Sequence, residues 1–434
     1  MNFVWLGLLG VGLLFALATG RLPELGNDAV DQAKAAVELA LGLAGVMALW
    51  LGIMKVAEAS GLVRLLSRAI SPLARHLFPG VPDNHPALSA IALNVAANAL
   101  GLSNAATPFG VRAMEELETL NPKAGVPSDA QATFVALNTA NVQLVPATLI
   151  ALRASAHSKD ASEIVGPTLL ATLCAMTCAL IAARLLARIP RFRREYESAP
   201  DKGAAAAAPP ASVDPPFAWT PRLAWTLAGM GLLAAATFLL AGRGYAVEHP
   251  TEGIFRLVNA AVSRAALPLM LVGIPLFATA MKVPAYERFI EGAKEGFALA
   301  IRILPYLVAI LVAVGVFRAS GAMEAVARAL GPFTDALGLP ADALPMVLVR
   351  PLSGSAASGV AAAVFANPAL GPDSYVGRLV SVMSGSTETT FYVLAVYFGA
   401  VGIRRYRQAL WAGLIADAAG FVASIVVVQA VFGR

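Results

Sequence analysis

The chain has 434 residues, of which 58% are hydrophobic and 14% are charged. Soluble domains average roughly 45–50% apolar and about 25% charged residues, so the apolar excess must face something other than a protein core. The apolar residues lie in runs of about 20, the length that crosses a lipid bilayer. The composition excludes an ordinary soluble protein and predicts a multi-pass membrane protein.

Charge and motif content exclude several classes of function. The net charge of +5 is small and lies in short stretches between apolar runs, so nucleic acid is not an expected partner. Cys174 and Cys178 lie one helical turn apart, where helix packing is favoured over a soft-metal site. The sequence contains no Walker A, G-x-S-x-G or H-E-x-x-H motif. We expect no enzyme activity, no cofactor and no metal.

Nine apolar runs are long enough to cross a bilayer, and the first lacks the basic start of a cleaved signal peptide. They cover residues 3–19, 36–57, 130–152, 165–187, 222–242, 263–281, 296–317, 376–402 and 408–432. Two further stretches, 86–116 and 341–370, are interrupted by Asn, Ser, Gly and Pro, which predicts re-entrant hairpins. Non-helical backbone at membrane depth must line protein or a water-filled cavity, so both hairpins should line a site.

The distribution of basic residues predicts an orientation. Arginines collect at residues 184–194 and 404–407, and such basic clusters mark cytoplasmic loops. Counting crossings from them also puts the loop 55–85 inside. The loops expected outside cover 20–35, 153–164 and 243–262. The acidic-leaning loop 117–129 falls inside, against the trend.

An Ala- and Pro-rich segment divides the chain into two units. Residues 195–221 carry no apolar periodicity, and this composition is typical of a flexible linker. We expect a first unit over 1–190, a linker over 191–221 and a second unit over 222–434.

The two units repeat one pattern. In each, a long span is followed by a Ser-Gly pair, an amphipathic stretch ending in Pro, an interrupted hairpin and a span with a polar midpoint. By the crossing count, the span 36–57 runs inward and the span 296–317 runs outward. Inverted repeats with polar breaks are typical of secondary transporters with a site near the midplane. We expect an all-α membrane protein of two inverted repeats, with about nine transmembrane helices and two re-entrant hairpins.

Two ionisable residues, Arg350 and Glu388, lie in otherwise uncharged membrane stretches, which marks them as functional candidates. They could pair across a site, or the pair could only hold two hairpins together. Neighbouring hydroxyls and amides could bind an anion or a polar solute, or could hydrogen-bond between helices. These candidates are Ser353, Ser355, Ser384, Ser386, Thr387 and Thr389 in the second unit, and Asn94, Asn98, Asn104, Asn138, Asn141 and Gln143 in the first.

Other polar residues are interpreted more simply. Lys55 and Glu58 have the spacing of an interfacial i,i+3 pair, which is favoured over a proton relay. Tyr392 and Tyr397 fit packing or interfacial positions better than ligand positions. Asp417 stands alone in the last span, and the sequence does not indicate a partner for it.

At these motifs the chain resembles two families. Residues 1 to about 190 resemble spore maturation protein A, through the segments from Leu49 to Glu58, from Asn94 to Pro108 and from Leu137 to Thr139. Residues from about 255 onward resemble spore maturation protein B, through the segments from Tyr286 to Gly296, from Arg350 to Ala356 and from Gly385 to Tyr392. The chain therefore resembles a natural fusion of the two.

Both families are similar to the nucleoside-recognition or Gate group, which includes the gates of concentrative nucleoside transporters and of the ferrous-iron permease. The resemblance implies a protein of the bacterial cytoplasmic membrane that passes or senses a small solute, linked in spore formers to dehydration of the spore core. The gate cysteines of the iron permease have no evident counterpart in these hairpins.

We expect a solute transporter or permease that works by alternating access. In this hypothesis Arg350 and the turn 353–355 bind an anionic or polar solute, and Glu388 couples or gates through protonation. The alternative is a non-transporting membrane scaffold or sensor, which predicts no cavity between the repeats. The expected partners are a small solute and the lipid bilayer, and the sequence leaves a homo-oligomer open.

Overall fold

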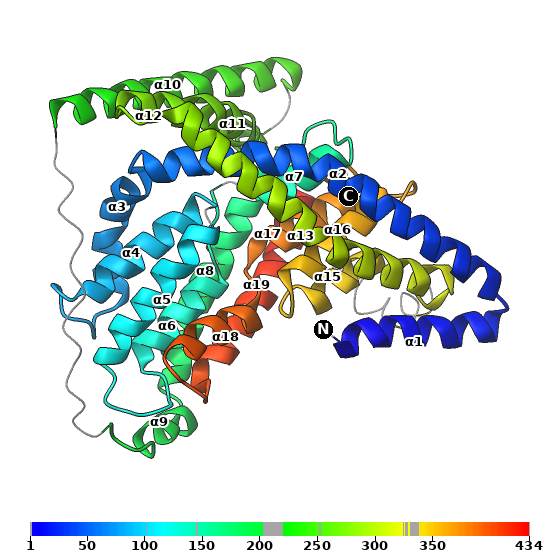
Figure 1. The fold of residues 1–434 in the computed structure, drawn as a ribbon, viewed down its shortest axis with the longest axis horizontal. Coiled ribbons are helices and arrows are strands. Elements are labelled where there is room, and N and C mark those ends of the chain that lie inside the picture. Colours follow the sequence, from blue (N-terminus) through cyan, green and yellow to red (C-terminus); the bar gives the residue numbers. More distant parts are fainter. Residues whose placement is uncertain are drawn as a thin grey trace.

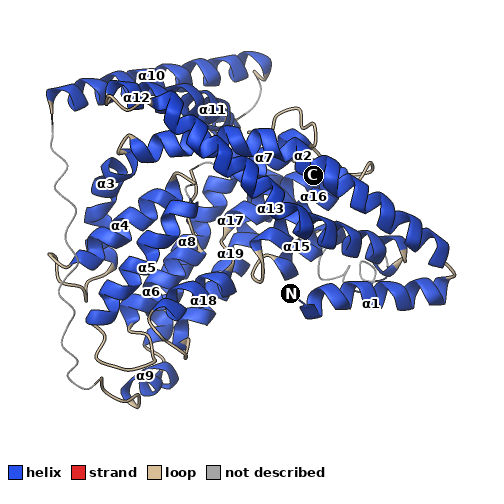
Figure 2. Cartoon of the chain, in the orientation of Figure 1, coloured by secondary structure: helices blue, strands red, loops and turns tan. Residues whose placement is uncertain are grey.

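The computed structural model describes residues 2–101, 103–144, 146–202, 220–250, 253–323, 325, 329 and 338–433. Within these residues helices are joined by loops and turns, and the β-pairing is one isolated bridge between Lys123 and Asp201 (Figure 2). Five helical stretches are long and apolar enough to cross a membrane: α2 (Leu22–Ala59), α8 (Val165–Ala187), α10 (Pro221–Glu248), the stretch Ile254–Ala280 and α19 (Arg407–Phe432). The protein is therefore an all-α, multi-pass membrane protein.

Figure 1 also shows the other helices and the three segments that make up the stretch Ile254–Ala280. In the first half they are α1 (Asn2–Thr19), α3 (Leu62–Leu77), α4 (Pro86–Ala99), α5 (Ser103–Thr119), α6 (Asp129–Thr139), α7 (Ala147–Ser155) and α9 (Pro190–Glu197). In the second half they are α11 (Ile254–Pro268), η1 (Leu269–Gly273), α12 (Ile274–Ala280), α13 (Ala285–Ala319), η2 (Ala341–Ala343), α15 (Leu344–Val349), α16 (Gly354–Ala366), α17 (Tyr375–Ser386) and α18 (Thr390–Ala400).

Two of the predicted spans are broken helices. The span predicted over 130–152 is divided into α6 and α7, and Pro146 directly precedes α7. Proline fits the start of a helix better than its interior, so Pro146 fits a helix that begins at Ala147. The span predicted over 376–402 is divided into α17 and α18 by extended backbone at Thr387. The sequence marked both midpoints as polar, but continuous helices through them were the wrong expectation.

The two hairpins form where the interrupted stretches were predicted. In the first, α4 and α5 are joined by a turn in which Gly101 takes φ +76°, a conformation that favours glycine. In the second, α15 and α16 are joined by residues 350–353, and the Ser353 hydroxyl caps the N-terminus of α16.

Corresponding helices of the two halves run antiparallel. Along α2 and α13, Gly52 lies against Phe289, and Gly315 lies against Gln32. Helices α8 and α19 also pack against each other. Arg407 at the start of α19 donates to the Phe192 carbonyl just beyond the end of α8, so this pair is antiparallel as well. Antiparallel pairing of equivalent helices is the arrangement that units of opposite orientation require.

The contact between α2 and α13 depends on two glycines one turn apart. A Cβ atom at Gly292 would lie 2.2 Å from the Leu51 carbonyl oxygen, and one at Gly296 would lie 2.4 Å from the Met47 carbonyl oxygen. No side chain fits at those distances. This is the small-xxx-small spacing that lets membrane helices approach closely.

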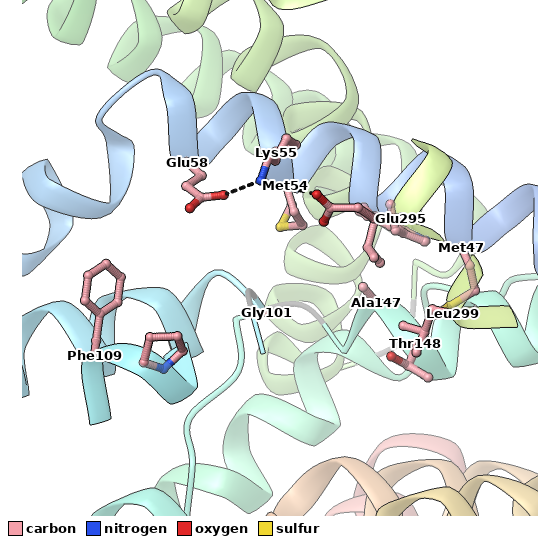
Figure 3. Close-up of a pocket in the computed structure, with 13 residues that line it drawn as sticks. Met47, Met54, Lys55, Glu58, Gly101, Phe109, Ala147, Thr148, Glu295 and Leu299 are labelled. Carbon is pink, nitrogen blue, oxygen red and sulfur yellow. Dashed lines mark ion pairs between the residues drawn. The ribbon is translucent and has the colours of Figure 1, made fainter. Parts of the chain in front are cut away.

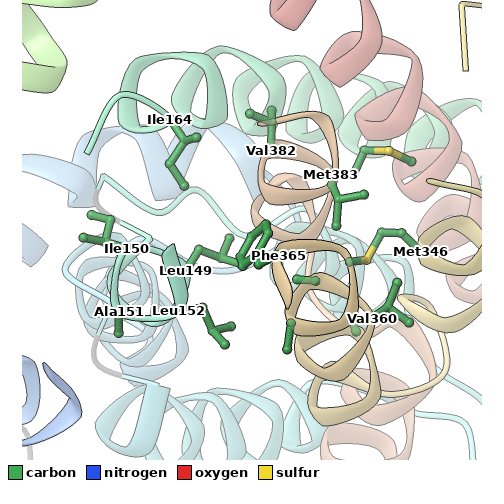
Figure 4. Close-up of a cluster of buried hydrophobic side chains, with 14 of the residues drawn as sticks. Leu149, Ile150, Ala151, Leu152, Ile164, Met346, Val360, Phe365, Val382 and Met383 are labelled. Atoms are coloured by element: carbon green, nitrogen blue, oxygen red, sulfur yellow. The ribbon is translucent and has the colours of Figure 1, made fainter. Parts of the chain in front are cut away.

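The largest apolar cluster contains side chains from both halves (Figure 4). Leu149 and Ile150 of α7 belong to it, together with Phe365 of α16 and Val382 of α17. The two halves are therefore packed around a shared core.

The segment expected as a linker begins later than predicted. Residues 190–197 form α9, and the following residues bind the loop after α5, where the Lys202 amide donates to the Pro122 carbonyl at 2.8 Å. Lys123 pairs with Asp201 at 2.8 Å. Both contacts join segments that are far apart in the sequence, so composition does not reveal them. Residues 203–219, the centre of the expected linker, lie outside the described residues.

The two basic clusters predicted to be cytoplasmic meet at one end of the molecule. Arg407 binds the carbonyls of Phe192 and Pro127 at 3.1 and 2.7 Å. The opposite end holds loops 156–164 and 367–374, which Arg153 and Asp373 connect by an ion pair of 3.0 Å.

Candidate functional site

The broken helices of the two halves touch at their breaks. The amide of Glu388, between α17 and α18, donates to the carbonyl of Thr139, the last residue of α6, at 2.6 Å. The amide of Leu144, between α6 and α7, donates to the carbonyl of Ala99 at the end of α4 at 2.9 Å. The breaks thus satisfy backbone groups at membrane depth through partners in other segments, as a low-dielectric setting requires.

Arg350 supports the break in the second half. It lies at the turn between α15 and α16, is 7% exposed and donates from Nη2 to the Thr387 carbonyl. The same Nη2 atom lies 3.9 Å from Oε2 of Glu388. The Phe391 amide, at the start of α18, donates to the Pro351 carbonyl at 3.1 Å. The hairpin turn therefore holds the broken helix open at this point.

A network of amides and one tyrosine connects the first hairpin to the α6 break. Asn98 donates to the Asn138 side-chain oxygen at 3.1 Å, and the Tyr397 hydroxyl donates to the same oxygen at 3.3 Å. Asn94 donates to the Ala106 carbonyl at 2.8 Å and lies 3.4 Å from the Tyr397 hydroxyl. Each of these side chains is hydrogen-bonded to another residue, so the network can hold the asparagine and tyrosine side chains in fixed orientations.

A cavity of about 400 Å³ lies against this network. It is lined by Asn98, Thr107, Pro108, Asn138, Glu388, Tyr392, Val393 and Tyr397. The volume falls within the roughly 300–1,000 Å³ of small-molecule sites. Its charged group is the Glu388 carboxylate, whose side chain is 30% exposed. The Gln143 amide approaches Oε1 of Glu388 at 3.5 Å, at the limit of a hydrogen bond.

The structure therefore brings together part of the predicted site. Asn98, Asn138 and Glu388 line the cavity, and Arg350 and Gln143 lie directly beside Glu388. The cavity lies between an amide-lined face from the first half and a carboxylate from the second.

Other predicted residues lie away from the cavity lining. The Ser353 hydroxyl is used as the cap of α16, and Ser386 bonds the Met383 carbonyl while packing against α19. Thr387 packs against α19 as well, and Thr389 lies against Gly354 of the hairpin. Asn94 acts behind the cavity through Tyr397, Asn141 and Ser384 are buried, and Ser355 is half-buried. The side chain of Asn104 lies outside those that the structure describes.

Sequence reasoning missed the tyrosines. Tyr397 was interpreted as packing, but its hydroxyl binds two asparagines, and both it and Tyr392 line the cavity. Val393 and Tyr397 are four residues apart, so they share one face of α18. That spacing was visible in the sequence, but only the position of the break at 387–389 shows that this face meets the asparagines.

Figure 3 shows a second cavity, of about 310 Å³, and Pro108 belongs to the lining of both cavities. Its wall includes Trp50 and Leu299, and one end carries Lys55 between Glu58 and Glu295, with both ion pairs at 3.4 Å. The predicted i,i+3 pair of Lys55 and Glu58 is present, and Glu295 of α13 extends it across the α2–α13 contact.

An ion cluster joins the halves at the end opposite the basic loops. Arg153 is fully buried and pairs with Glu163 and Asp373, and Arg378 donates to Glu163 at 2.8 and 3.1 Å. Burial raises the pKa of Asp373, but hydrogen bonds from the Lys159 amide and Ser158, with the charge of Arg153, outweigh it and hold that pKa below its usual range.

Within the described residues, no group of three or more His, Cys, Asp or Glu side chains could hold a metal ion. Cys174 is exposed and Cys178 is half-buried on α8. The described site thus offers hydrogen-bonding groups and carboxylates rather than a ligand set for a transition metal.

Comparison with known proteins gives consistent matches. The sequence model of the family described as "Gate: Nucleoside recognition" matches residues 40–156 and 300–404, together about half of the chain. Spore maturation protein B of Bacillus subtilis (strain 168) is 52% identical over 172 residues, which are 40% of this chain and 96% of that protein. Spore maturation protein A of the same organism is 43% identical over 173 residues, 40% of this chain and 88% of that protein.

A solved structure shares the fold. The crystal structure of the Alcanivorax borkumensis YdaH transporter, described as having an unusual topology, matches with a TM-score of 0.50 and 17% sequence identity. The match covers 100% of this chain and 98% of that one. At this identity the likeness concerns the fold alone.

Proposed function

Because the chain belongs to the nucleoside-recognition (Gate) family, as a fusion of units related to spore maturation proteins A and B, we propose that it is a secondary transporter or permease for a small polar solute. The proposal places it in the bacterial cytoplasmic membrane, with residues 1–190 and 222–434 as the two repeat units. A transporter of the same fold supports membrane transport as the general activity.

The observation that carries the proposal is the cavity of about 400 Å³ between the halves. A scaffold whose polar groups all paired with one another would leave no such space. Here Asn98 and Asn138 bond each other and still line the cavity, and Glu388 faces it from the other half. Convergent amides and a carboxylate around a cavity of this size are typical of a solute site.

The position of Arg350 refines the class of solute. The sequence suggested that its guanidinium binds an anion, but this group is buried and holds the Thr387 carbonyl. The charge that faces the cavity is the Glu388 carboxylate. Carboxylates and amide oxygens accept hydrogen bonds, so a neutral or cationic solute rich in N–H and O–H groups fits better than an anion.

The two cavities support alternating access as the mechanism in this proposal. Pro108 lines both, so the first turns of α5 separate the solute cavity from the cavity beside Lys55. Movement of the α4–α5 hairpin relative to α2 and α13 would open one cavity toward the other. Rigid-body movement of one part against a fixed site is the general mechanism of inverted-repeat transporters.

A non-transporting role in envelope or spore maturation is the second candidate, and the names of the two curated relatives favour it. Uptake by protein reconstituted in liposomes distinguishes the two. A panel of nucleosides, small carboxylates, small amines and Fe²⁺ is offered to liposomes with and without protein. Transport predicts protein-dependent uptake of at least one polar neutral or cationic solute. No protein-dependent uptake of any of them would contradict the proposal.

A further inference from the structure

A buried carboxylate lies behind the solute site and takes no part in the function proposed above. Asp417 lies in the apolar helix α19 and is 2% exposed. Its Oδ2 atom accepts a hydrogen bond from the Thr390 hydroxyl at 2.6 Å. Its Oδ1 atom has no hydrogen-bond partner among the described residues. Ionisable groups at membrane depth are expensive and mark functional sites by default.

A second unpartnered oxygen lies next to it. Thr387 is also 2% exposed, and its Oγ1 atom lies beside the Asp417 carboxylate without a well-formed hydrogen bond to any described residue. Buried hydroxyl and carboxylate oxygens of native proteins nearly always have partners. Two unpaired oxygens on neighbouring side chains therefore indicate a place for an additional group.

The backbone explains why these oxygens meet. The backbone is extended at Thr387 and at Thr389, and along extended backbone successive side chains point to opposite sides. Glu388 faces the solute cavity, whereas Thr387 faces α19. Gly420 allows the close approach, because a Cβ atom there would lie 2.9 Å from Oγ of Ser386 and 3.0 Å from Thr387. One break thus separates the cavity from the Asp417 carboxylate.

The charges around the break do not balance. Arg350 carries one positive charge, whereas Glu388 and Asp417 carry two negative charges when ionised. Of the elements packed on α19 near this level, α6 contributes Thr139 and α8 contributes alanines such as Ala175, and these side chains carry no charge. The next charged group of α19 is Arg407, which pairs with Asp129. An unbalanced carboxylate in a low-dielectric interior requires a cation or a proton.

We propose that Asp417, Thr387 and Thr390 form a site for one monovalent cation, Na⁺ or H⁺, that couples to solute transport. Carboxylate and hydroxyl oxygens are the ligands that hard cations prefer. Occupancy would stabilise the break whose other side presents Glu388 to the solute. The coupling role rests on the transport function proposed above, whereas cation binding does not.

Cation binding is measured on the purified full-length protein in detergent, without solute. The midpoint of thermal unfolding is followed at constant ionic strength while choline is replaced by Na⁺ at alkaline pH, and separately while pH is lowered in choline. A ligand that binds the native state raises the midpoint with its concentration. We expect wild type to respond to at least one of the two cations by a few degrees.

Substitutions assign the response to this site. Asp417→Asn, which has the same shape without the charge, should abolish the response. Ser424→Ala is the matched control, because Ser424 is also fully buried on α19 but bonds only the Gly420 carbonyl. Thr387→Val should weaken a Na⁺ response at least tenfold and leave a proton response in place, which identifies the cation. If Asp417→Asn does not fold, Asp417→Ser, which also removes the carboxylate, should abolish the response to either cation and provides the test.

The outcomes separate this inference from the transport proposal. A wild-type protein that responds to neither cation, or an Asp417→Asn variant that responds as wild type does, would overturn the cation site, even where solute uptake is observed. A cation response that Asp417→Asn abolishes supports the site even where every solute in the uptake panel fails.

Discussion

The amide of Glu388 and the carbonyl of Thr139 are joined by a hydrogen bond of 2.6 Å. These residues lie at the breaks of equivalent helices from the two halves, so the bond joins the repeats at the solute cavity. Glu388 faces that cavity, while its neighbour Thr387 is held by Arg350. The position of the carboxylate therefore depends on both halves at once.

Substitution of Arg350 tests the support of the break. Arg350→Ala should lower the free energy of unfolding by about 2–4 kcal/mol, because it leaves the Thr387 carbonyl and the Glu388 carboxylate without their partner. Arg350→Lys should restore only part of this free energy of unfolding, since an ammonium group lacks the planar, paired N–H donors of a guanidinium. Denaturant or thermal unfolding measures both. The control, Arg193→Ala, removes an exposed pair with Glu197 and should cost less than about 0.5 kcal/mol.

The hydroxyl of Tyr397 orients two asparagines at the cavity. Tyr397→Phe keeps the ring contact with Phe134, whose centroid is 5.5 Å away, and removes the bonds to Asn94 and Asn138. We expect solute affinity to fall about 5- to 10-fold, corresponding to roughly one hydrogen bond. Binding of a solute from the uptake panel measures the change. Equal loss in Tyr406→Phe, outside the cavity, would show that the effect is not local.

The close contact of α2 and α13 requires glycine. Gly292→Val or Gly296→Val would place side-chain atoms inside the α2 backbone, so these variants should fail to yield monodisperse protein in size-exclusion chromatography. Gly244→Val is the control, because a Cβ atom there meets nothing within 4 Å. Normal behaviour of both α13 variants would contradict the antiparallel pairing.

The ion cluster at Asp373 predicts a pH dependence. Its pKa is held below the usual value of about 4, so the stabilisation it provides is complete above that value. The stabilisation is lost as pH falls through the lowered folded-state pKa. Asp373→Asn should be less stable than wild type at neutral pH, and the two should converge in acid. Parallel unfolding curves at every pH would contradict this assignment.

Several elements were predictable from sequence because their signals are local. Apolar runs gave the membrane helices, and the Gly-, Pro- and Asn-rich stretches gave both hairpins. Pro146 also gives a local reason for the place where α7 begins. The second break has no proline, and the extended conformation of Thr387 depends on Arg350, 37 residues earlier in the chain. A sequence pattern does not show such a tertiary contact.

Only part of the candidate site was predicted from the sequence, because the rest also depends on tertiary contacts. Polar type identified Asn98, Asn138 and Glu388, which line the cavity. Polarity alone could not distinguish these cavity-lining residues from hydroxyl residues such as Ser386, which packs against α19. The change to extended backbone at Thr387 decides which side chains face α19. The cluster around Arg153 was not anticipated, since its partners come from loops about 220 residues apart.

The most direct test of the account is uptake through the Glu388 cavity. A solute found by the liposome panel is measured with wild type, Glu388→Gln and Glu248→Gln, the last at an exposed glutamate of α10. Removing a charged hydrogen-bonding group from a binding site typically costs about 1.5–3 kcal/mol, so Glu388→Gln should reduce uptake at least tenfold. Glu248→Gln should match wild type. Equal uptake by Glu388→Gln and wild type would show that the solute does not pass through this cavity.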